Sequence, residues 1–123
     1  MTDLEPATTV RNCRQMAVDA LNSLKAIDVA VLDVRDRTSF TDYMIVASGT
    51  SSRHVISIAE AVIEQAKQSP TPPRGIEGQE VGEWILVDLG DVIVHVMMPE
   101  IREYYELEKL WRETPVSKPQ AQI

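Results

Sequence analysis

The segment Trp84-Ile-Leu-Val-Asp-Leu-Gly-Asp-Val-Ile-Val-His-Val-Met97 decides the fold that this sequence predicts. Two apolar runs flank Gly90-Asp91, a two-residue connection with glycine first, as a type II′ hairpin turn requires. Pairing Leu89 with Val92 across this turn fixes the register of the whole hairpin. The sequence therefore predicts two antiparallel strands with a defined partner for every residue.

This register gives the hairpin two unlike faces. One face is apolar throughout and is predicted to lie under helices: Ile85, Val87, Leu89, Val92, Val94 and Val96. The other face mixes aromatic, apolar, acidic and imidazole side chains: Trp84, Leu86, Asp88, Ile93, His95 and Met97. A mixed face of this kind is a candidate for function, because it offers both apolar area and polar groups.

Upstream of the hairpin, the pattern predicts a helix, two strands and a second helix. Thr9 is expected to cap the first helix, and the turn Gly49-Thr50-Ser51-Ser52 the second. Segments 28–33 and 43–48 are short, apolar and rich in β-branched residues, which is typical of strands. The helical stripes are Val10, Cys13, Ala17, Ala20, Leu21 and Leu24, and then Val55, Ile58, Ala59, Val62, Ile63 and Ala66.

The remaining segments complete an α/β fold. Residues 69–82 contain three prolines and three glycines, which exclude a long helix but allow a brief edge strand over 74–77. Pro99 leads into a last helix. Its expected core stripe is Ile101, Tyr104, Leu107 and Trp111. We expect one domain over residues 1–114, with a small mixed sheet of four or five strands flanked by helices, and a flexible tail over 115–123.

Charge is concentrated in one third of the chain. Residues 77–113 hold ten carboxylates and three cations, whereas the rest of the chain holds nine of each, so this segment carries the whole formal charge of −7. The same segment contains both tryptophans and two of the three tyrosines. An acidic surface with aromatic anchors favours docking onto a basic partner, although negative charge also serves solubility alone.

Composition disfavours several other classes of protein. No apolar run reaches the roughly 20 residues that a membrane span needs, and the acidic start is unlike a secretory signal, so a cytoplasmic protein is expected. Clustered Lys and Arg for binding nucleic acid backbones are lacking. Cys13 is predicted to be a buried inert thiol, and His54 and His95 show no metal-ligand spacing. Neither a metal nor a cofactor is expected.

Nucleotidyl transfer is the main enzymatic alternative. Gly49-Thr50-Ser51-Ser52 before a helix could hold phosphate through backbone amides, and Asp33, Asp36 and Asp42 are close in sequence. However, a strict pair of acids on one strand face is missing, because Val34 and Arg35 follow Asp33. Helix capping explains the serines without catalysis, so no catalytic residue is assigned.

Several long motifs closely resemble one known family. These are Glu77-Gly78, the run 84–91, Val94-His95-Val96-Met97, the run 102–111 and the upstream run 42–54. Together they resemble the ribosomal silencing factor family, also called the RsfS or Iojap family, over roughly residues 10–112. The resemblance implies a nucleotidyltransferase-like fold without enzymatic activity. It also implies binding to the large ribosomal subunit at the ribosomal protein conventionally numbered fourteen. This binding obstructs joining of the small subunit and thereby lowers translation when nutrients fail. Members commonly form homodimers in crystals.

The mixed hairpin face suggests which residues make the contact. The expected partner-binding residues are Trp84, Leu86, Asp88, Asp91, His95 and Tyr105. The apolar and imidazole groups would form the centre, and the two aspartates would meet Lys or Arg of the partner. For Trp84, a core ring or a dimer contact remains the alternative, and Tyr105 could equally pack inside. Tyr104, on the core stripe, is expected to pack inside.

Overall fold

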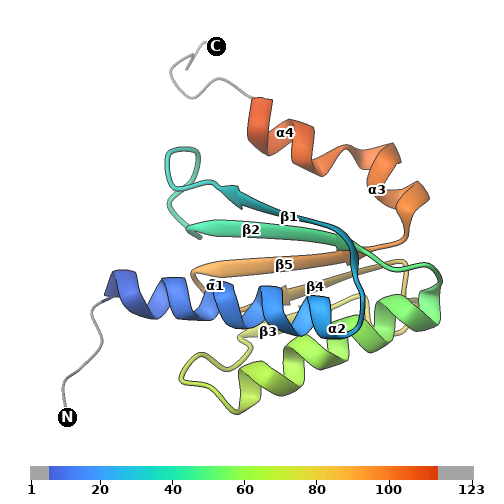
Figure 1. Cartoon of the computed structure of the whole chain (residues 1–123). Coiled ribbons are helices and arrows are strands. Elements are labelled where there is room, and N and C mark those ends of the chain that lie inside the picture. Colours follow the sequence, from blue (N-terminus) through green and yellow to red (C-terminus); the bar gives the residue numbers. More distant parts are fainter. Residues whose placement is uncertain (1–5, 114–123) are drawn as a thin grey trace.

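The computed structural model describes residues 6–113, which form a five-stranded sheet with helices on both faces (Figure 1). The mixed α/β fold class predicted from the sequence is confirmed. The elements, in chain order, are α1 (Pro6–Ser23), β1 (Ile27–Asp33), β2 (Tyr43–Ser48), α2 (Ser52–Lys67), β3 (Gly75–Glu77), β4 (Trp84–Asp88), β5 (Val92–Met97), α3 (Pro99–Tyr105) and α4 (Leu107–Glu113). The predicted flexible tail, residues 115–123, lies outside the described residues.

The sheet has the strand order β1-β2-β5-β4-β3. Strands β2 and β5 are parallel and the other three pairs are antiparallel, so the sheet is mixed. The predicted hairpin register is confirmed, with Leu86 opposite His95 and Trp84 opposite Met97. Gly90 has φ of +91°, the positive value that its place in the turn requires and that glycine adopts without strain.

Helices α1 and α2 cover the apolar face of the hairpin. The stripe predicted for α2 is buried at every position, and that of α1 is buried from Val10 to Leu21. Helix α1 begins at Pro6, so the prediction that Thr9 caps it is wrong. Proline favours the first turn of a helix because its fixed φ suits the helix and its missing N–H would be unpaired there anyway. Cys13 is buried as predicted, and burial raises the pKa of its thiol.

Helices α3 and α4 lie on the opposite face of the sheet (Figure 1). Ile101, Leu107 and Trp111 pack there against a second apolar cluster that includes Met44 and Met97. The single last helix expected from the sequence is instead two helices.

The chain breaks between α3 and α4 at Glu106, whose backbone is left-handed with φ 49° and ψ 45°. The break shifts the helical phase of Leu107 and Trp111 relative to α3, so the expected stripe is not continuous, and Tyr104 is 78% exposed. The prediction that Tyr104 packs inside the protein is therefore wrong. Within the part of the chain that the structure describes, no helix is long and apolar enough to span a bilayer.

Candidate functional site

Trp84, the first residue of β4, is the centre of the candidate site. Its side chain is half-buried on the face of the sheet that α3 and α4 also cover. The indole Nε1–H donates a hydrogen bond of 2.9 Å to His95 Nδ1 on the neighbouring strand, and the two ring centroids are 5.9 Å apart. This bond fixes the tilt of the indole, since Trp has only one donor and no acceptor. The imidazole of His95 thus supports and orients the Trp84 ring.

His95 itself is only 5% exposed, so in this structure a partner meets the Trp84 ring before it can meet the imidazole. Burial lowers the pKa of His95 to about 4, because the low-dielectric interior disfavours the charged ring. Since Nδ1 accepts from Trp84, the neutral ring carries its proton on Nε2, which has no hydrogen-bond partner among the described residues. The expected contact residue His95 therefore lies beneath the surface as a support.

Two tyrosines at the end of α3 extend the aromatic surface. The Tyr105 ring packs against Trp84 with centroids 5.0 Å apart, and Tyr104 meets Tyr105 edge-on at 4.9 Å. Tyr105 is 54% exposed. We call Trp84, Tyr105 and Tyr104 the aromatic ridge. Two large, largely exposed rings next to a half-buried indole suit recognition of another macromolecule, because such rings supply much area with little entropy to lose.

The other predicted site residues divide into two groups. Leu86 is half-buried two residues along β4 from Trp84, on the same face. Asp88 lies about 13 Å from Trp84, by the usual rise of about 3.3 Å per residue, and its Oδ1 accepts 2.8 Å from the Gly90 amide. Asp91 is exposed at the hairpin turn, beyond Asp88. The structure therefore brings Leu86, His95 and Tyr105 together around Trp84, but not the two aspartates.

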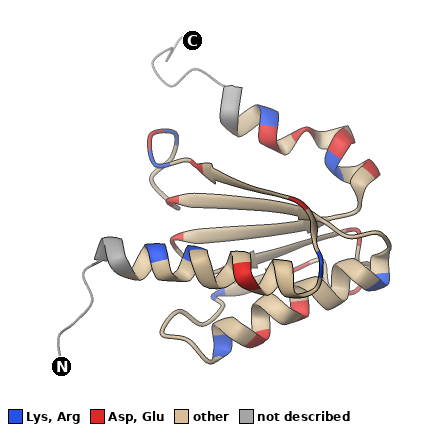
Figure 2. Ribbon diagram, in the orientation of Figure 1, with Lys and Arg blue, Asp and Glu red and all other residues tan. Residues whose placement is uncertain are grey.

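Other carboxylates lie closer to the aromatic ridge. Glu83 directly precedes Trp84, and three glutamates of the α3 segment are exposed: Glu100, Glu103 and Glu106. Charged positions fall on helices, loops and strand ends, and the strands are free of charge along most of their length (Figure 2). Exposed glutamates, and not the two predicted aspartates, are thus the acids nearest in the chain to the aromatic ridge.

The glycine turn before α2 is occupied by contacts within the chain. The Gly49 amide donates to the Met97 carbonyl at 3.1 Å, and the Thr50 amide to His54 Nδ1 at 2.9 Å. Ser51 is the N-cap and accepts from the His54 amide, as capping predicts. These donors and the cap hydroxyl are already paired, which leaves less for a phosphate.

The acids of the enzymatic alternative are also far from that turn. Asp33 pairs with Tyr43 at one end of β2, whereas the turn follows Ser48 at the other end, about 16 Å away by the rise of a strand. An ion pair with Arg35 lowers the pKa of Asp33. Among residues 6–113, no group of three or more His, Cys, Asp or Glu side chains is placed to hold a metal ion. The acids and the turn do not form one site.

Comparison with known proteins identifies relatives over most of the chain. A family described as "Ribosomal silencing factor during starvation" matches residues 7–123. A ribosomal silencing factor RsfS from Chromobacterium violaceum is 43% identical over 102 residues, which cover 83% of this chain and 84% of that protein. The mouse protein named mitochondrial assembly of ribosomal large subunit protein 1 is 38% identical over 99 residues, covering 78% of this chain and 43% of its own length. A crystal structure of a Chromobacterium violaceum protein matches with a TM-score of 0.82 and 40% identity, over 89% of this chain and 97% of that one.

Proposed function

The chain belongs to the ribosomal silencing factor family, and on that premise we propose that it represses translation by binding the large ribosomal subunit and blocking its association with the small subunit. The proposed contact is a basic ribosomal protein at the joining face, the one conventionally numbered fourteen. The proposed mechanism is steric: the bound domain occupies volume that the small subunit needs, and no bond is made or broken. We propose that this repression occurs under nutrient limitation, in keeping with the word starvation in the family's description.

The aromatic ridge is the observation that carries this proposal. Tyr104 and Tyr105 are largely exposed beside Trp84, and the same helix segment carries the exposed glutamates Glu100, Glu103 and Glu106. Ribosomal proteins are typically basic, so a ridge of rings among carboxylates would match one in both charge and shape. The mouse relative's name refers to the large subunit, which favours that subunit as the partner.

Sedimentation tests partner and mechanism together. Purified protein is centrifuged through sucrose with separate large subunits, with separate small subunits, and with both at a magnesium concentration that permits joining. We expect the protein in the large-subunit fraction alone, and fewer joined ribosomes as its concentration rises. Large subunits that sediment without the protein would refute the proposal, and binding that leaves joining unchanged would refute the steric mechanism.

Substitution of Trp84 tests the proposed contact surface. Trp84→Ala should weaken binding to large subunits by about 2 kcal/mol, because a central aromatic contact typically contributes that much. Phe40→Ala is the control, since Phe40 is a more exposed ring that packs edge-on against Trp111 instead of lying on the ridge. Equal affinity of a folded Trp84→Ala variant and the wild type in a pull-down would remove Trp84 from the surface.

We further propose that the protein acts in the cytoplasm without a cofactor and that it can form a homodimer. Analytical ultracentrifugation at several concentrations measures the dimer, and a single monomeric species throughout would contradict it.

Incubation with nucleoside triphosphates and divalent metal tests the enzymatic alternative. Nucleotide turnover by the purified protein would overturn the non-enzymatic proposal.

A further inference from the structure

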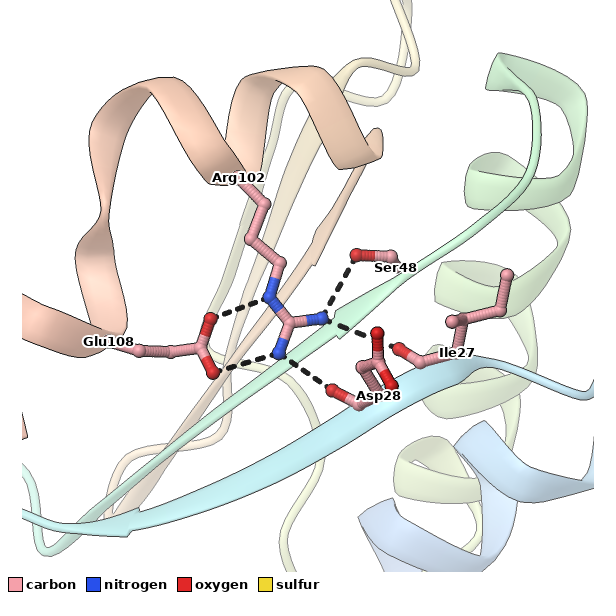
Figure 3. A network of polar contacts seen from close by, with 5 residues as sticks. All are labelled: Ile27, Asp28, Ser48, Arg102 and Glu108. Atoms are coloured by element: carbon pink, nitrogen blue, oxygen red, sulfur yellow. Dashed lines mark hydrogen bonds and ion pairs between the residues drawn. The ribbon is translucent and has the colours of Figure 1, made fainter.

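An ion pair spans the break between α3 and α4. Arg102 Nε donates to Glu108 Oε1 at 2.6 Å, and Nη2 donates to Glu108 Oε2 at 2.9 Å (Figure 3). The Arg102 side chain is only 12% exposed, so solvent screens this bidentate ion pair weakly. By contrast, Lys109 and Glu106 meet at 4.0 Å with both side chains mostly exposed, and such pairs contribute little.

The same guanidinium also donates hydrogen bonds to two strands of the sheet. Nη1 donates to Ser48 Oγ at 2.9 Å and to the Ile27 carbonyl at 3.4 Å, and Nη2 donates to the Asp28 carbonyl at 2.7 Å (Figure 3). A guanidinium has five N–H groups, and these five contacts use all of them. Arg102 is therefore a structural tie between the helix break and the ends of β1 and β2, with its donors already committed.

An irregularity in β1 makes two of these acceptors available. The pairing of β1 with β2 shifts register between Ile27 and Ala30, and Asp28 has a positive φ of 52°. Aspartate tolerates this conformation better than most residues. A bulge takes backbone carbonyls out of the ladder, and here the carbonyls of Ile27 and Asp28 accept from Arg102 instead.

Helix α3 depends on such a tie. None of its seven residues, all of which the structure describes, is buried, and a helix of that length is not stable alone. Tyr105 ends this helix three residues after Arg102 and packs against Trp84. Arg102 and Tyr105 therefore lie about one turn apart on the same short helix.

We propose that Arg102 is a positioning residue for the partner-binding surface: its bonds to Glu108, Ser48 and the β1 bulge hold Tyr105 against Trp84, so that the aromatic ridge is formed before the partner arrives. This inference rests on the proposed function, because it concerns the same surface. A surface ordered in advance binds more tightly, since less conformational entropy is lost on binding. Arg102 itself need not touch the partner.

Binding to purified large ribosomal subunits is the first measurement. Arg102→Met keeps much of the apolar stem and removes all five donors, and we expect affinity to fall about tenfold. Lys109→Met is the matched control, because it makes the same change of charge on the neighbouring helix and loses only the weak contact with Glu106. Equal losses in both variants would mean that charge alone matters and would overturn the proposal. Should Arg102→Met not fold, Arg102→Lys tests the same point without a change of charge, since lysine keeps the charge but cannot make the bidentate contact; unchanged affinity in that variant would overturn the proposal.

A double-mutant cycle separates positioning from general destabilisation. If Arg102 acts through Tyr105, Arg102→Met should weaken binding in the wild type but change it less than about twofold in a Tyr105→Ala background. Additive losses in the folded double variant would contradict the proposal.

NMR tests the positioning without any ribosome. In the wild type we expect cross-peaks between the Tyr105 and Trp84 rings; they should vanish in Arg102→Met and persist in Lys109→Met. Their persistence in Arg102→Met would overturn the inference. If the wild type fails to bind large subunits, the proposed function fails, whereas this measurement still decides whether Arg102 holds the ridge.

Discussion

His95 combines burial with an incomplete set of hydrogen bonds. Its Nδ1 is satisfied by Trp84, but its Nε2–H is buried without a partner among the described residues, an arrangement that typically costs about 1–3 kcal/mol. Hairpin register predicted that Trp84 and His95 share a face, but it could not predict their bond, because strand pairing fixes where Cβ atoms lie and not how rings turn.

The lowered pKa of His95 predicts a dependence of stability on pH. The folded value is about 4, below the ordinary 6.5, so between these values the unfolded chain binds the extra proton and unfolding is favoured. Stability should therefore fall as pH drops from 6.5 toward 4, and the part due to His95 should be about 2 kcal/mol between pH 7 and pH 5. Urea unfolding at pH 7, 6 and 5 measures it.

His95→Asn is the control for this pH dependence. The Asn side-chain oxygen can take the place of Nδ1 as acceptor for Trp84, and the amide does not titrate. The variant should lose less stability than the wild type over the same pH range. Parallel losses in the two proteins would show that other groups, and not His95, cause the dependence.

At the scale of elements, the sequence predicted those parts of the fold that follow a local period. The stripe of α2 and the hairpin register are as expected, because each repeats a simple spacing set by helix or strand geometry. The break at Glu106 could not be predicted, since it has neither glycine nor proline to mark it. Arg102, Glu108 and the β1 bulge stabilise it, and contacts 74 or 75 residues apart leave no local signal.

Substitutions at Glu106 test the break through its backbone. In a left-handed conformation, a residue with a Cβ atom is less stable than glycine by about 1 kcal/mol. The free energy of unfolding of Glu106→Gly should therefore exceed that of Glu106→Ala by about that amount. A continuous helix would give the reverse order, with alanine better by about 1 kcal/mol. Both variants remove the same charge, so thermal unfolding of the pair isolates the backbone. Greater stability of the alanine variant would exclude the break.

At the scale of the whole molecule, the two faces of the sheet differ in how they are covered. Helices α1 and α2 cover one face with long buried stripes, whereas the short helices α3 and α4 cover the other face and leave the aromatic ridge partly exposed (Figure 1). The acidic segment identified from the sequence contains β4, β5 and both of these helices. The ridge and its glutamates therefore lie together because one continuous segment builds this part of the protein.

Association with the large subunit should respond to where a charge lies as well as to how many there are. Glu103→Lys, beside Tyr104 on α3, should slow association at low salt by at least about threefold, because it removes an acid next to the ridge and adds a repelling cation. Glu60→Lys makes the same change of net charge at an exposed position of α2, which covers the opposite face of the sheet, so it should slow association much less. The two rates should converge as salt is raised, because screening shortens the reach of both charges to a few ångströms at about 1 M.

Stopped-flow mixing with labelled large subunits measures these rates. Equal slowing by the two variants would mean that net charge alone steers the encounter, and a wild-type rate indifferent to salt would remove electrostatics from the docking step altogether.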